Sequence, residues 1–209
     1  MAILPRDFYN GDTVCIAQEL LGKYLVRVLD GEPLVCRITE TEAYVGRCDR
    51  ACHAFGYRRT ARNAVMFGPP GHAYIYFIYG MHYCLNFVTE PEGEPSAVLI
   101  RAAEPIYGID TIRRLRFGAE TPAKMTTYQR KNFMNGPGKL CKGLSLSIVD
   151  NTTDLTENEL FVCDSPADIG LPCPPSPPPE AVTSGPRIGV DYAGADKDLP
   201  WRFLLTPKR

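Results

Sequence analysis

Two glutamates lie two residues apart in the segment LVCRITETEAYV, residues 34–45, and are the first candidates for chemistry. The apolar and β-branched residues around them predict a strand, whose side chains alternate between two faces. One face is expected to hold Cys36, Ile38, Glu40, Glu42 and Tyr44, and the other to hold Arg37, Thr39 and Thr41. Against a core, at least one carboxylate would be partly desolvated, which is an environment suited to a general base.

The sequence leaves the role of these acids open between catalysis and structure. A buried carboxylate is also satisfied by an ion pair, and Arg101 lies in an otherwise apolar strand, residues 97–105. Two neighbouring carboxylates also suggest glycoside hydrolysis, in which they flank the scissile bond. Acids two apart on a strand lie roughly 6–7 Å apart and point the same way, so they do not flank a bond easily. We therefore expect one working acid and one structural acid.

The segment YIYFIYGMHYCLNF, residues 74–87, combines four tyrosines with a predicted turn. Two short apolar runs flank Gly80-Met81, which indicates a β-hairpin. A buried tyrosine hydroxyl needs a hydrogen-bond partner, so a core hairpin would more often carry Val, Ile, Leu or Phe. Two interpretations remain open. The segment is either a buried strand pair with satisfied hydroxyls, or a surface that stacks its rings against flat groups such as nucleobases.

Length and composition indicate an ordinary globular protein. The 209 residues are 44% hydrophobic and 22% charged. No apolar run approaches the roughly 20 residues that a membrane span needs, and the N-terminal MAILPRDFYNGD becomes polar too early for a secretory signal. Eight irregularly spaced cysteines do not resemble a disulfide framework. We therefore expect reduced thiols in the cytoplasm.

The residues Cys48, Cys52 and His53 form a short cluster that suggests zinc. A structural zinc site needs four ligands, usually from two paired clusters. The sequence has no second cluster with that spacing. We therefore predict that the protein uses no metal and no cofactor.

Charge is segregated along the chain, although the net charge is only −1. Residues 113–142 contain eight basic residues and one acid, whereas residues 150–168 contain six acids and no Lys or Arg. A second basic cluster comprises Arg58, Arg59 and Arg62. In GPGKLCKGL, Pro137 favours a helix start, where the backbone near Gly138 and the Lys139 side chain would seat a phosphate. The pattern fits a protein that binds a polyanion, and it equally fits two solvated surfaces.

The elements that must position these residues are short helices and strands. Helices are expected over 13–21, 110–117 and 127–133 and from Pro137, and strands over 23–29, 33–45, 97–105, 187–190 and 201–205 and in the tyrosine hairpin. Asp12-Thr13 would cap the first helix, Gly22 would close it, and Asp30-Gly31 would join the first two strands. Residues 165–180 are too rich in proline for helix or sheet and predict an extended surface loop. The expected result is one α+β domain over residues 1–209.

Five motifs occur in an order that resembles a known enzyme family. They are ETEAY (40–44), Ala51-Cys52-His53, RTARNAVMFGPPGHAYIYFIYGM (59–81), LIRAAEP (99–105) and GPGKLCKGL (136–144). Together they resemble the compact, mammalian-like type of the alkyladenine (3-methyladenine) DNA glycosylase family, from about Asp7 to Leu205. The resemblance implies a curved, mostly antiparallel sheet with short flanking helices and a protruding β-hairpin.

The resemblance also implies roles for individual residues. Glu42 matches the general base that activates a water, and Arg101 matches the arginine that helps to hold this carboxylate. The residues that match the wall of the base pocket are Tyr44, Ala51, His53, Tyr76 and Asn86. Tyr79 matches the tyrosine that enters the gap left by a flipped nucleotide, with Met81 beside it, so we expect Tyr79 to be solvent-exposed. Our candidates for binding DNA phosphates are Arg58, Arg59, Gly138 and Lys139.

The implied function is that of a monofunctional DNA glycosylase in base excision repair. It would flip a damaged purine such as 3-methyladenine, hypoxanthine or ethenoadenine out of duplex DNA and hydrolyse its N-glycosidic bond as a monomer. His82, Leu85 and Asp191 depart from residues common in relatives, which bears on pocket width and substrate preference. A non-catalytic damage sensor would not need Glu42. A hydrolase of free nucleosides would need neither Tyr79 nor the basic segment.

Overall fold

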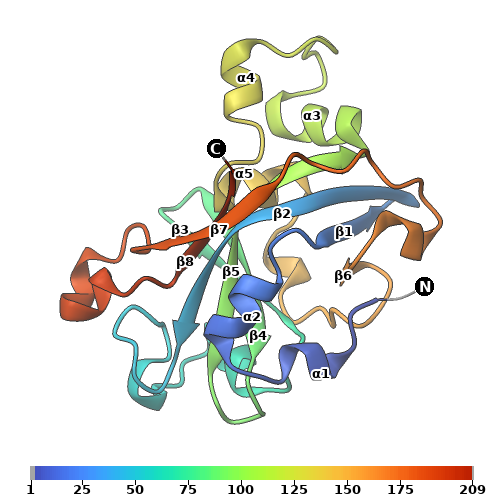
Figure 1. The fold of residues 1–209 in the computed structure, drawn as a ribbon. Coiled ribbons are helices and arrows are strands. Elements are labelled where there is room, and N and C mark those ends of the chain that lie inside the picture. The colour runs from blue at the N-terminus through green and yellow to red at the C-terminus, as the bar shows by residue number, and fades with distance from the viewer. Residues whose placement is uncertain (1–2, 209) are drawn as a thin grey trace.

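One antiparallel sheet joins the two halves of the chain in the structure, a computed structural model that describes residues 3–208 (Figure 1). Its strands are β1 (Tyr24–Leu29), β2 (Glu32–Val45), β3 (Ala73–Ile78), β4 (His82–Thr89), β5 (Ser96–Tyr107), β6 (Leu160–Cys163), β7 (Glu180–Gly185) and β8 (Arg202–Pro207). The order is β3-β4-β5-β2-β1-β6, and β8 pairs with both β2 and β7. The late strand β8 thus lies beside the part of β2 that carries Glu42.

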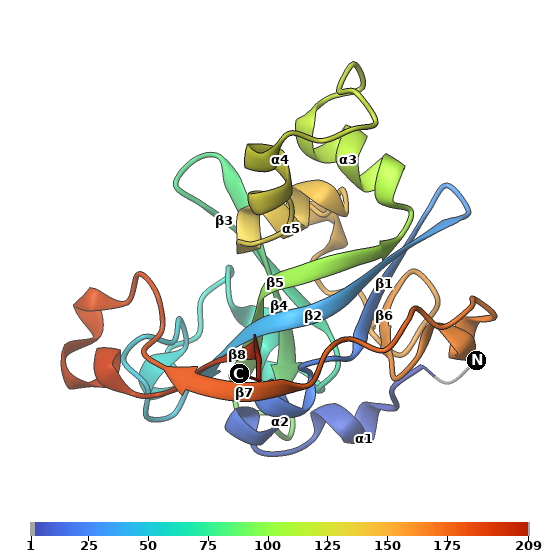
Figure 2. The same ribbon diagram turned by 45° about the horizontal axis from the view of Figure 1, so that its top comes forward.

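Short helices gather near two ends of this sheet. They are α1 (Arg6–Tyr9), α2 (Thr13–Glu19), α3 (Ile109–Phe117), α4 (Thr127–Lys131) and α5 (Pro137–Gly143), with 3-10 helices at Phe55–Tyr57, Ala64–Phe67, Ile148–Asp150, Pro166–Ile169 and Asp191–Asp198. Figure 2 shows α3, α4 and α5 grouped at one end and α1 and α2 at the other. Among residues 3–208, no helix has the length and apolar character to cross a membrane. The α+β prediction is confirmed.

Local sequence signals account for the start of α2 and for the first hairpin. The Asp12 carboxylate accepts a hydrogen bond from the backbone N–H of Cys15 at 2.9 Å, which caps α2 as predicted. β1 and β2 join at Asp30 and Gly31, whose φ angles are 51° and 81°. Two successive positive φ angles match the twist of a two-residue hairpin, so this prediction is also confirmed.

The predicted face of Glu42 is wrong because β2 is irregular at its centre. Register shifts interrupt its pairing with β5 between Ile38 and Glu40 and again between Glu40 and Thr41. Beyond them the Thr41 hydroxyl donates to a backbone carbonyl of α2 at 2.6 Å, and Ala43 packs in the main hydrophobic core together with Ile38. The first shift adds one residue to β2 and the second adds one to β5, so β2 itself gains a single residue, which turns its following side chains to the other face. Glu42 therefore lies on the face opposite to Ile38.

The tyrosine hairpin consists of β3 and β4, as predicted. Ile78 pairs with His82, so the connection is the three-residue loop Tyr79–Met81, one residue longer than the predicted turn. Tyr79 and Gly80 have φ angles of 54° and 65°. Figure 2 shows this loop projecting from the body beside α4 and α5. The protruding hairpin is therefore confirmed, with Tyr79 inside its loop.

Two predictions about the last third of the chain are wrong. Residues 187–190 form no strand, because the Arg187 side chain turns inward to an ion pair with Asp49, and β7 lies before them. Residues 165–180 are mostly extended, but a 3-10 helix interrupts them at Pro166–Ile169, and Glu180 already belongs to β7. An ion pair accompanies the first departure, and in the second the Ser165 hydroxyl caps the 3-10 helix by accepting the backbone N–H of Ala167.

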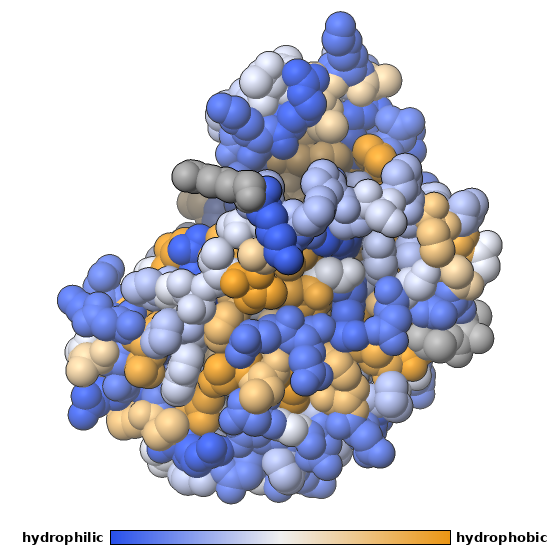
Figure 3. Space-filling model, viewed as in Figure 1, coloured by the Kyte–Doolittle hydropathy of each residue, from blue (hydrophilic) through white to orange (hydrophobic). Residues whose placement is uncertain are grey.

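The basic segment 113–142 lies mainly on the surface. Figure 3 shows a largely hydrophilic surface over α3 and α4. Arg113 is an exception, because it is buried and donates to the backbone carbonyl of Thr121. The predicted helix 127–133 ends early, at Lys131, because Phe133 is buried in the main core.

Candidate active site

A cleft of about 880 Å³ opens against β2, β3, β4 and β5, within the size range of small-molecule sites. The predicted site residues in its lining are Tyr44, Ala51, His53, Tyr76, Tyr79, Asn86, Arg101, Gly138 and Lys139. Met81, Arg58 and Arg59 lie outside this lining. The structure therefore brings together the predicted base pocket, the hairpin tip and the start of α5, but not the Arg58-Arg59 pair.

Glu42 lies beneath the wall of this cleft, with no exposed side-chain surface. Its Oε1 accepts the backbone N–H of Ile188 at 2.9 Å, and its Oε2 accepts the Tyr44 hydroxyl at 2.7 Å. The Nη1 atom of Arg101 lies 3.4 Å from Oε2. Tyr44, Arg101 and Ile188 all line the cleft, so the carboxylate connects with it through all three of its partners.

Glu40 has a different environment from Glu42. Its Oε1 lies 3.2 Å from Nε of Arg101 and 2.5 Å from Nε of Arg202, and its side chain is 15% exposed. Two guanidinium groups therefore hold Glu40, whereas a tyrosine hydroxyl, a backbone amide and one guanidinium hold Glu42. Two different carboxylate environments thus occur in one strand, and Arg101 pairs with both acids.

Aromatic rings form the inner wall of the cleft. His53 and Tyr76 meet edge to face, with ring centroids 4.7 Å apart, and His53 Nδ1 lies 2.8 Å from the Tyr74 hydroxyl. The Arg62 guanidinium lies over the Tyr76 ring at 4.8 Å from its centroid. Asn86 is buried beside them, and its amide donates to the backbone carbonyl of Tyr74 at 3.0 Å. The wall thus presents flat rings that are fixed by polar contacts.

Burial keeps the ionisable rings of this wall neutral. Burial and, secondly, the Arg62 guanidinium lower the pKa of His53 to about 4. Burial raises the pKa of the Tyr44 and Tyr76 hydroxyls well above their ordinary value, and the Glu42 carboxylate adds to this effect on Tyr44. Near pH 7 the wall therefore offers neutral imidazole and phenol groups, which donate hydrogen bonds without carrying charge.

The hairpin tip stands at the mouth of the cleft. Tyr79 is 76% exposed and Met81 is 68% exposed, which confirms the expected exposure of Tyr79. A tyrosine with a φ of 54° is strained, because left-handed backbone suits Gly or Asn better. Because Tyr79 is exposed and its backbone is strained, packing does not explain why a tyrosine occupies this position.

The start of α5 closes another side of the cleft. Lys139 Nζ donates to the side-chain oxygens of Asn132 and Asn135 at 2.8 and 2.9 Å. Burial and Arg116 lower the pKa of Lys139. A Cβ atom at Gly138 would lie 2.9 Å from the His82 ring, so this glycine allows the close approach of His82. The start of α5 therefore combines a partly buried cation with a tight backbone contact.

The departures from the family pattern fall in different places. His82 lines the cleft, whereas Leu85 is fully buried in the main core and is absent from the cleft wall. Asp191 begins the last 3-10 helix, next to Tyr192, which lines the cleft mouth. The expectation that Leu85 tunes pocket width is therefore wrong, since β4 turns it to the opposite face from Asn86.

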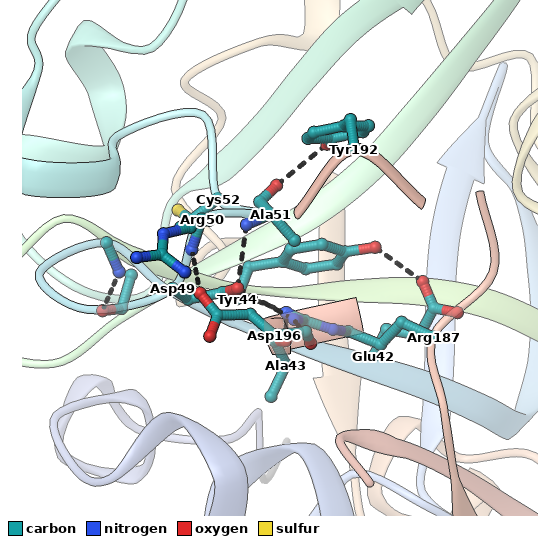
Figure 4. Close-up of polar contacts among 12 residues, drawn as sticks. Glu42, Ala43, Tyr44, Asp49, Arg50, Ala51, Cys52, Arg187, Tyr192 and Asp196 are labelled. Carbon is teal, nitrogen blue, oxygen red and sulfur yellow. Dashed lines mark hydrogen bonds and ion pairs between the residues drawn. The ribbon is translucent and has the colours of Figure 1, made fainter. Parts of the chain in front are cut away.

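Sequence reasoning missed four residues of the site. Arg62 was grouped only with a basic cluster, and Tyr192 lies in a segment with no recognised motif. Figure 4 shows the Tyr192 hydroxyl directed at the Ala51 carbonyl, which it reaches at 3.1 Å. Asp49 and Arg187 form a fully buried ion pair behind Tyr44. The only sequence signal for Arg187 was a charged residue in a segment predicted to return to the core.

Comparisons with known proteins agree with this arrangement. The sequence model of methylpurine-DNA glycosylase matches residues 7–209. A Methanocella arvoryzae protein is 48% identical over 204 residues, covering 97% of this chain and 92% of its own. A Desulfitobacterium hafniense protein is 43% identical, covering 98% and 96%, and a Bacillus cereus protein is 43% identical, covering 95% and 93%. All three carry a provisional name as 3-methyladenine DNA glycosylases. The chain therefore belongs to the methylpurine-DNA glycosylase family, whose members are hydrolases of N-glycosyl bonds.

Proposed function

We propose that the protein is a monofunctional, monomeric DNA glycosylase that removes damaged purines from duplex DNA by hydrolysis. The observation that carries this proposal is the position of Glu42, a fully buried carboxylate bonded to three residues that line an aromatic cleft. Desolvating a carboxylate is unfavourable, so a protein that only senses damage gains nothing from one in this place. Family membership supports the same reaction class.

Glu42 acts as the general base in this proposal. A water bound beside the carboxylate gives a proton to Glu42 while its oxygen attacks C1′ of the damaged nucleotide. The bond between C1′ and the purine nitrogen breaks, and the purine leaves with the electron pair. Oε2 accepts both the Tyr44 hydroxyl and Arg101, whereas Oε1 accepts only the Ile188 amide, so a further lone pair on Oε1 is available to the water. Arg101 pairs with the same carboxylate.

The aromatic wall selects the base. Stacking on Tyr44 and Tyr76 favours electron-poor rings, and most strongly the cationic ring of a purine methylated on nitrogen, such as 3-methyladenine. Such a base departs as a neutral molecule. Hypoxanthine and ethenoadenine are neutral and leave less readily, so they need a donor to the departing ring. His53, which is neutral at physiological pH, lies close enough to Tyr76 to meet a stacked base.

The hairpin tip and the start of α5 hold the duplex. Tyr79 enters the gap left by the flipped nucleotide and offsets part of the few kcal/mol that flipping costs. Lys139, at the edge of the same cleft, binds a phosphate of the damaged strand. Its amine is already bonded to two asparagine oxygens, so we propose no covalent intermediate with lysine and no strand cleavage.

The test uses duplexes that each carry one defined lesion, followed by alkaline cleavage of abasic sites. The expected result is excision by the wild-type protein of at least one alkylated or deaminated purine, and no strand cleavage before alkali. DNA methylated with a labelled methyl group extends the test to 3-methyladenine, which is released as a free base. Lesion binding without any excision would indicate a damage sensor. Cleavage of free nucleosides without duplex binding would indicate a nucleoside hydrolase. Either outcome contradicts the proposal.

A further inference from the structure

Arg187 and Asp49 form an ion pair in which neither side chain has any exposed surface. Asp49 follows β2, and Arg187 follows β7, 138 residues later in the chain. Nη2 of Arg187 donates to Oδ1 of Asp49 at 2.8 Å, and Nη1 donates to Oδ2. This bidentate arrangement fixes the orientation of both groups. Figure 4 shows both residues near Glu42 and Tyr44. Neither residue lines the cleft and both side chains are buried, so neither is placed to touch DNA.

Arg187 anchors the backbone amide that bonds to Glu42. Its Nη1 also donates to the backbone carbonyl of Ala43 at 2.8 Å, which ties Arg187 to β2 beside Glu42. The next residue, Ile188, donates its N–H to Glu42 Oε1 at 2.9 Å. Because Arg187 and Ile188 are adjacent, a displaced guanidinium displaces this N–H relative to the carboxylate.

The same guanidinium supports the second donor to Glu42. Its Cζ atom lies 4.8 Å from the centroid of the Tyr44 ring and 5.2 Å from that of Trp201. The Tyr44 hydroxyl donates to Glu42 Oε2 at 2.7 Å. Two of the three donors to Glu42 therefore depend on where Arg187 lies, and Arg101 alone does not.

Asp49 extends this network towards the base pocket. Its Oδ1 accepts the backbone N–H of Ala51 at 2.9 Å, and Ala51 lines the cleft. Burying an ion pair is a weak source of stability, because desolvation offsets most of the attraction. The Nε atom of Arg187 is buried with no hydrogen-bond partner, which costs free energy of folding. This cost is a further argument against a purely stabilising role for Arg187.

We propose that Arg187, held by Asp49, is a positioning residue that orients Glu42 through the Ile188 amide and the Tyr44 hydroxyl. This inference rests on the proposed function and adds a residue to it that no motif indicated. Reacting groups must be held close to their productive geometry, and a displacement of about 1 Å costs on the order of 100-fold in rate. The inference therefore predicts a loss in the chemical step and little loss in DNA binding.

The test is Arg187→Lys, which keeps the charge beside Asp49 but cannot make the same set of bonds. Single-turnover excision is measured with excess enzyme on the lesion that the wild-type protein removes best. We expect the rate constant to fall roughly 10- to 100-fold. Affinity for the lesion duplex should stay within about threefold, because neither residue of the pair reaches the DNA. Titration of active sites separates a slower enzyme from a partly unfolded sample.

Arg27→Lys is the matched control. Arg27 pairs with Asp150 at 2.7 Å, both side chains are largely buried, and its Nε is likewise buried without a partner. This pair joins β1 to the 3-10 helix at Ile148–Asp150, outside the cleft. Arg27→Lys should lower the melting temperature about as much as Arg187→Lys, but it should change the excision rate less than about twofold. Equal rate losses in both variants would overturn the inference.

A double-mutant cycle tests whether Arg187 acts through Glu42. In a Glu42→Gln background, Arg187→Lys should change the residual rate less than about twofold, because the group that it orients has been removed. The same fold-loss in both backgrounds, or a wild-type rate in Arg187→Lys alone, refutes the positioning role. If Arg187→Lys does not fold, Asp49→Asn is used, because it keeps an acceptor for Ala51 but removes the charge. A wild-type protein inactive on every lesion would instead overturn the proposed function.

Discussion

The exposed tyrosine at the hairpin tip can be removed with almost no change in stability. Tyr79 is 76% exposed, so about a quarter of its side chain, roughly 50 Å², is covered. At about 25 cal/mol per Å² this contact contributes at most ~1.2 kcal/mol to folding. A left-handed backbone costs a tyrosine about 1 kcal/mol or more, and asparagine tolerates that conformation. For Tyr79→Asn these two effects nearly cancel, so we expect the melting temperature to change by less than about 3 °C.

Excision by the same variant should depend on how firmly the lesion is paired. Loss of the inserted ring removes a stacking contribution of about 1–3 kcal/mol, which corresponds to a roughly 5- to 150-fold slower reaction on a fully paired lesion. In a mismatch or a single strand, flipping costs less, so the loss should shrink to about threefold or below. The assay compares single-turnover excision of one lesion, such as hypoxanthine, in these three settings, alongside thermal melts.

Tyr57 provides a matched control on the same chain. It also has a left-handed backbone, with φ of 62°, is 47% exposed and lies outside the cleft lining. Tyr57→Asn should leave excision within about twofold of wild type in all three settings. If Tyr79→Asn loses the same fraction of its excision rate on paired and on single-stranded DNA, the proposal that Tyr79 enters the duplex is refuted. A melting temperature more than 5 °C lower, together with normal excision, would show instead that Tyr79 packs the hairpin.

Three further predictions concern the base, the phosphate contact and the histidine of the pocket. Glu42→Gln should slow excision roughly 10²–10⁴-fold while affinity for the lesion duplex, measured by gel shift, stays within about threefold; near-normal excision would contradict the role of Glu42. Lys139→Gln should weaken binding to damaged and undamaged DNA alike and flatten the plot of log affinity against log salt by about one unit, whereas an unchanged slope would place Lys139 away from phosphates. The pKa of His53 in the folded protein is about 4, below that of a histidine in the unfolded chain. As pH falls from about 6.5 to 4, the unfolded chain therefore binds more protons than the folded protein, and the free energy of unfolding decreases over that range. Between pH 7.5 and 5, the melting temperature of His53→Asn should therefore fall less than that of the wild type. The difference should be small because the His53 ring is partly exposed. An equal fall in both proteins would contradict the lowered pKa of His53.

Features governed by neighbouring residues followed from the sequence. The Asp12 cap of α2, the Asp30-Gly31 turn and the tyrosine hairpin all occur where their local signals predicted them. The exposure of Tyr79 followed from the family resemblance, in which this tyrosine of the hairpin contacts DNA. The sequence context marked Glu40 and Glu42 as acids in an apolar strand, and the family resemblance selected Glu42 between them.

The tertiary structure alone decided how that acid is held. Strand periodicity placed Glu42 on the face of Ile38, but one extra residue in β2 turns it away, and no local signal marks where a strand accommodates an extra residue. The Ile188 amide that bonds to Glu42 is 146 residues away in sequence, in a segment that resembles a strand until Arg187 pairs with Asp49. Short-range preferences are set by a few adjacent side chains. The geometry around Glu42 depends instead on contacts between distant segments, which exist only once the chain has folded.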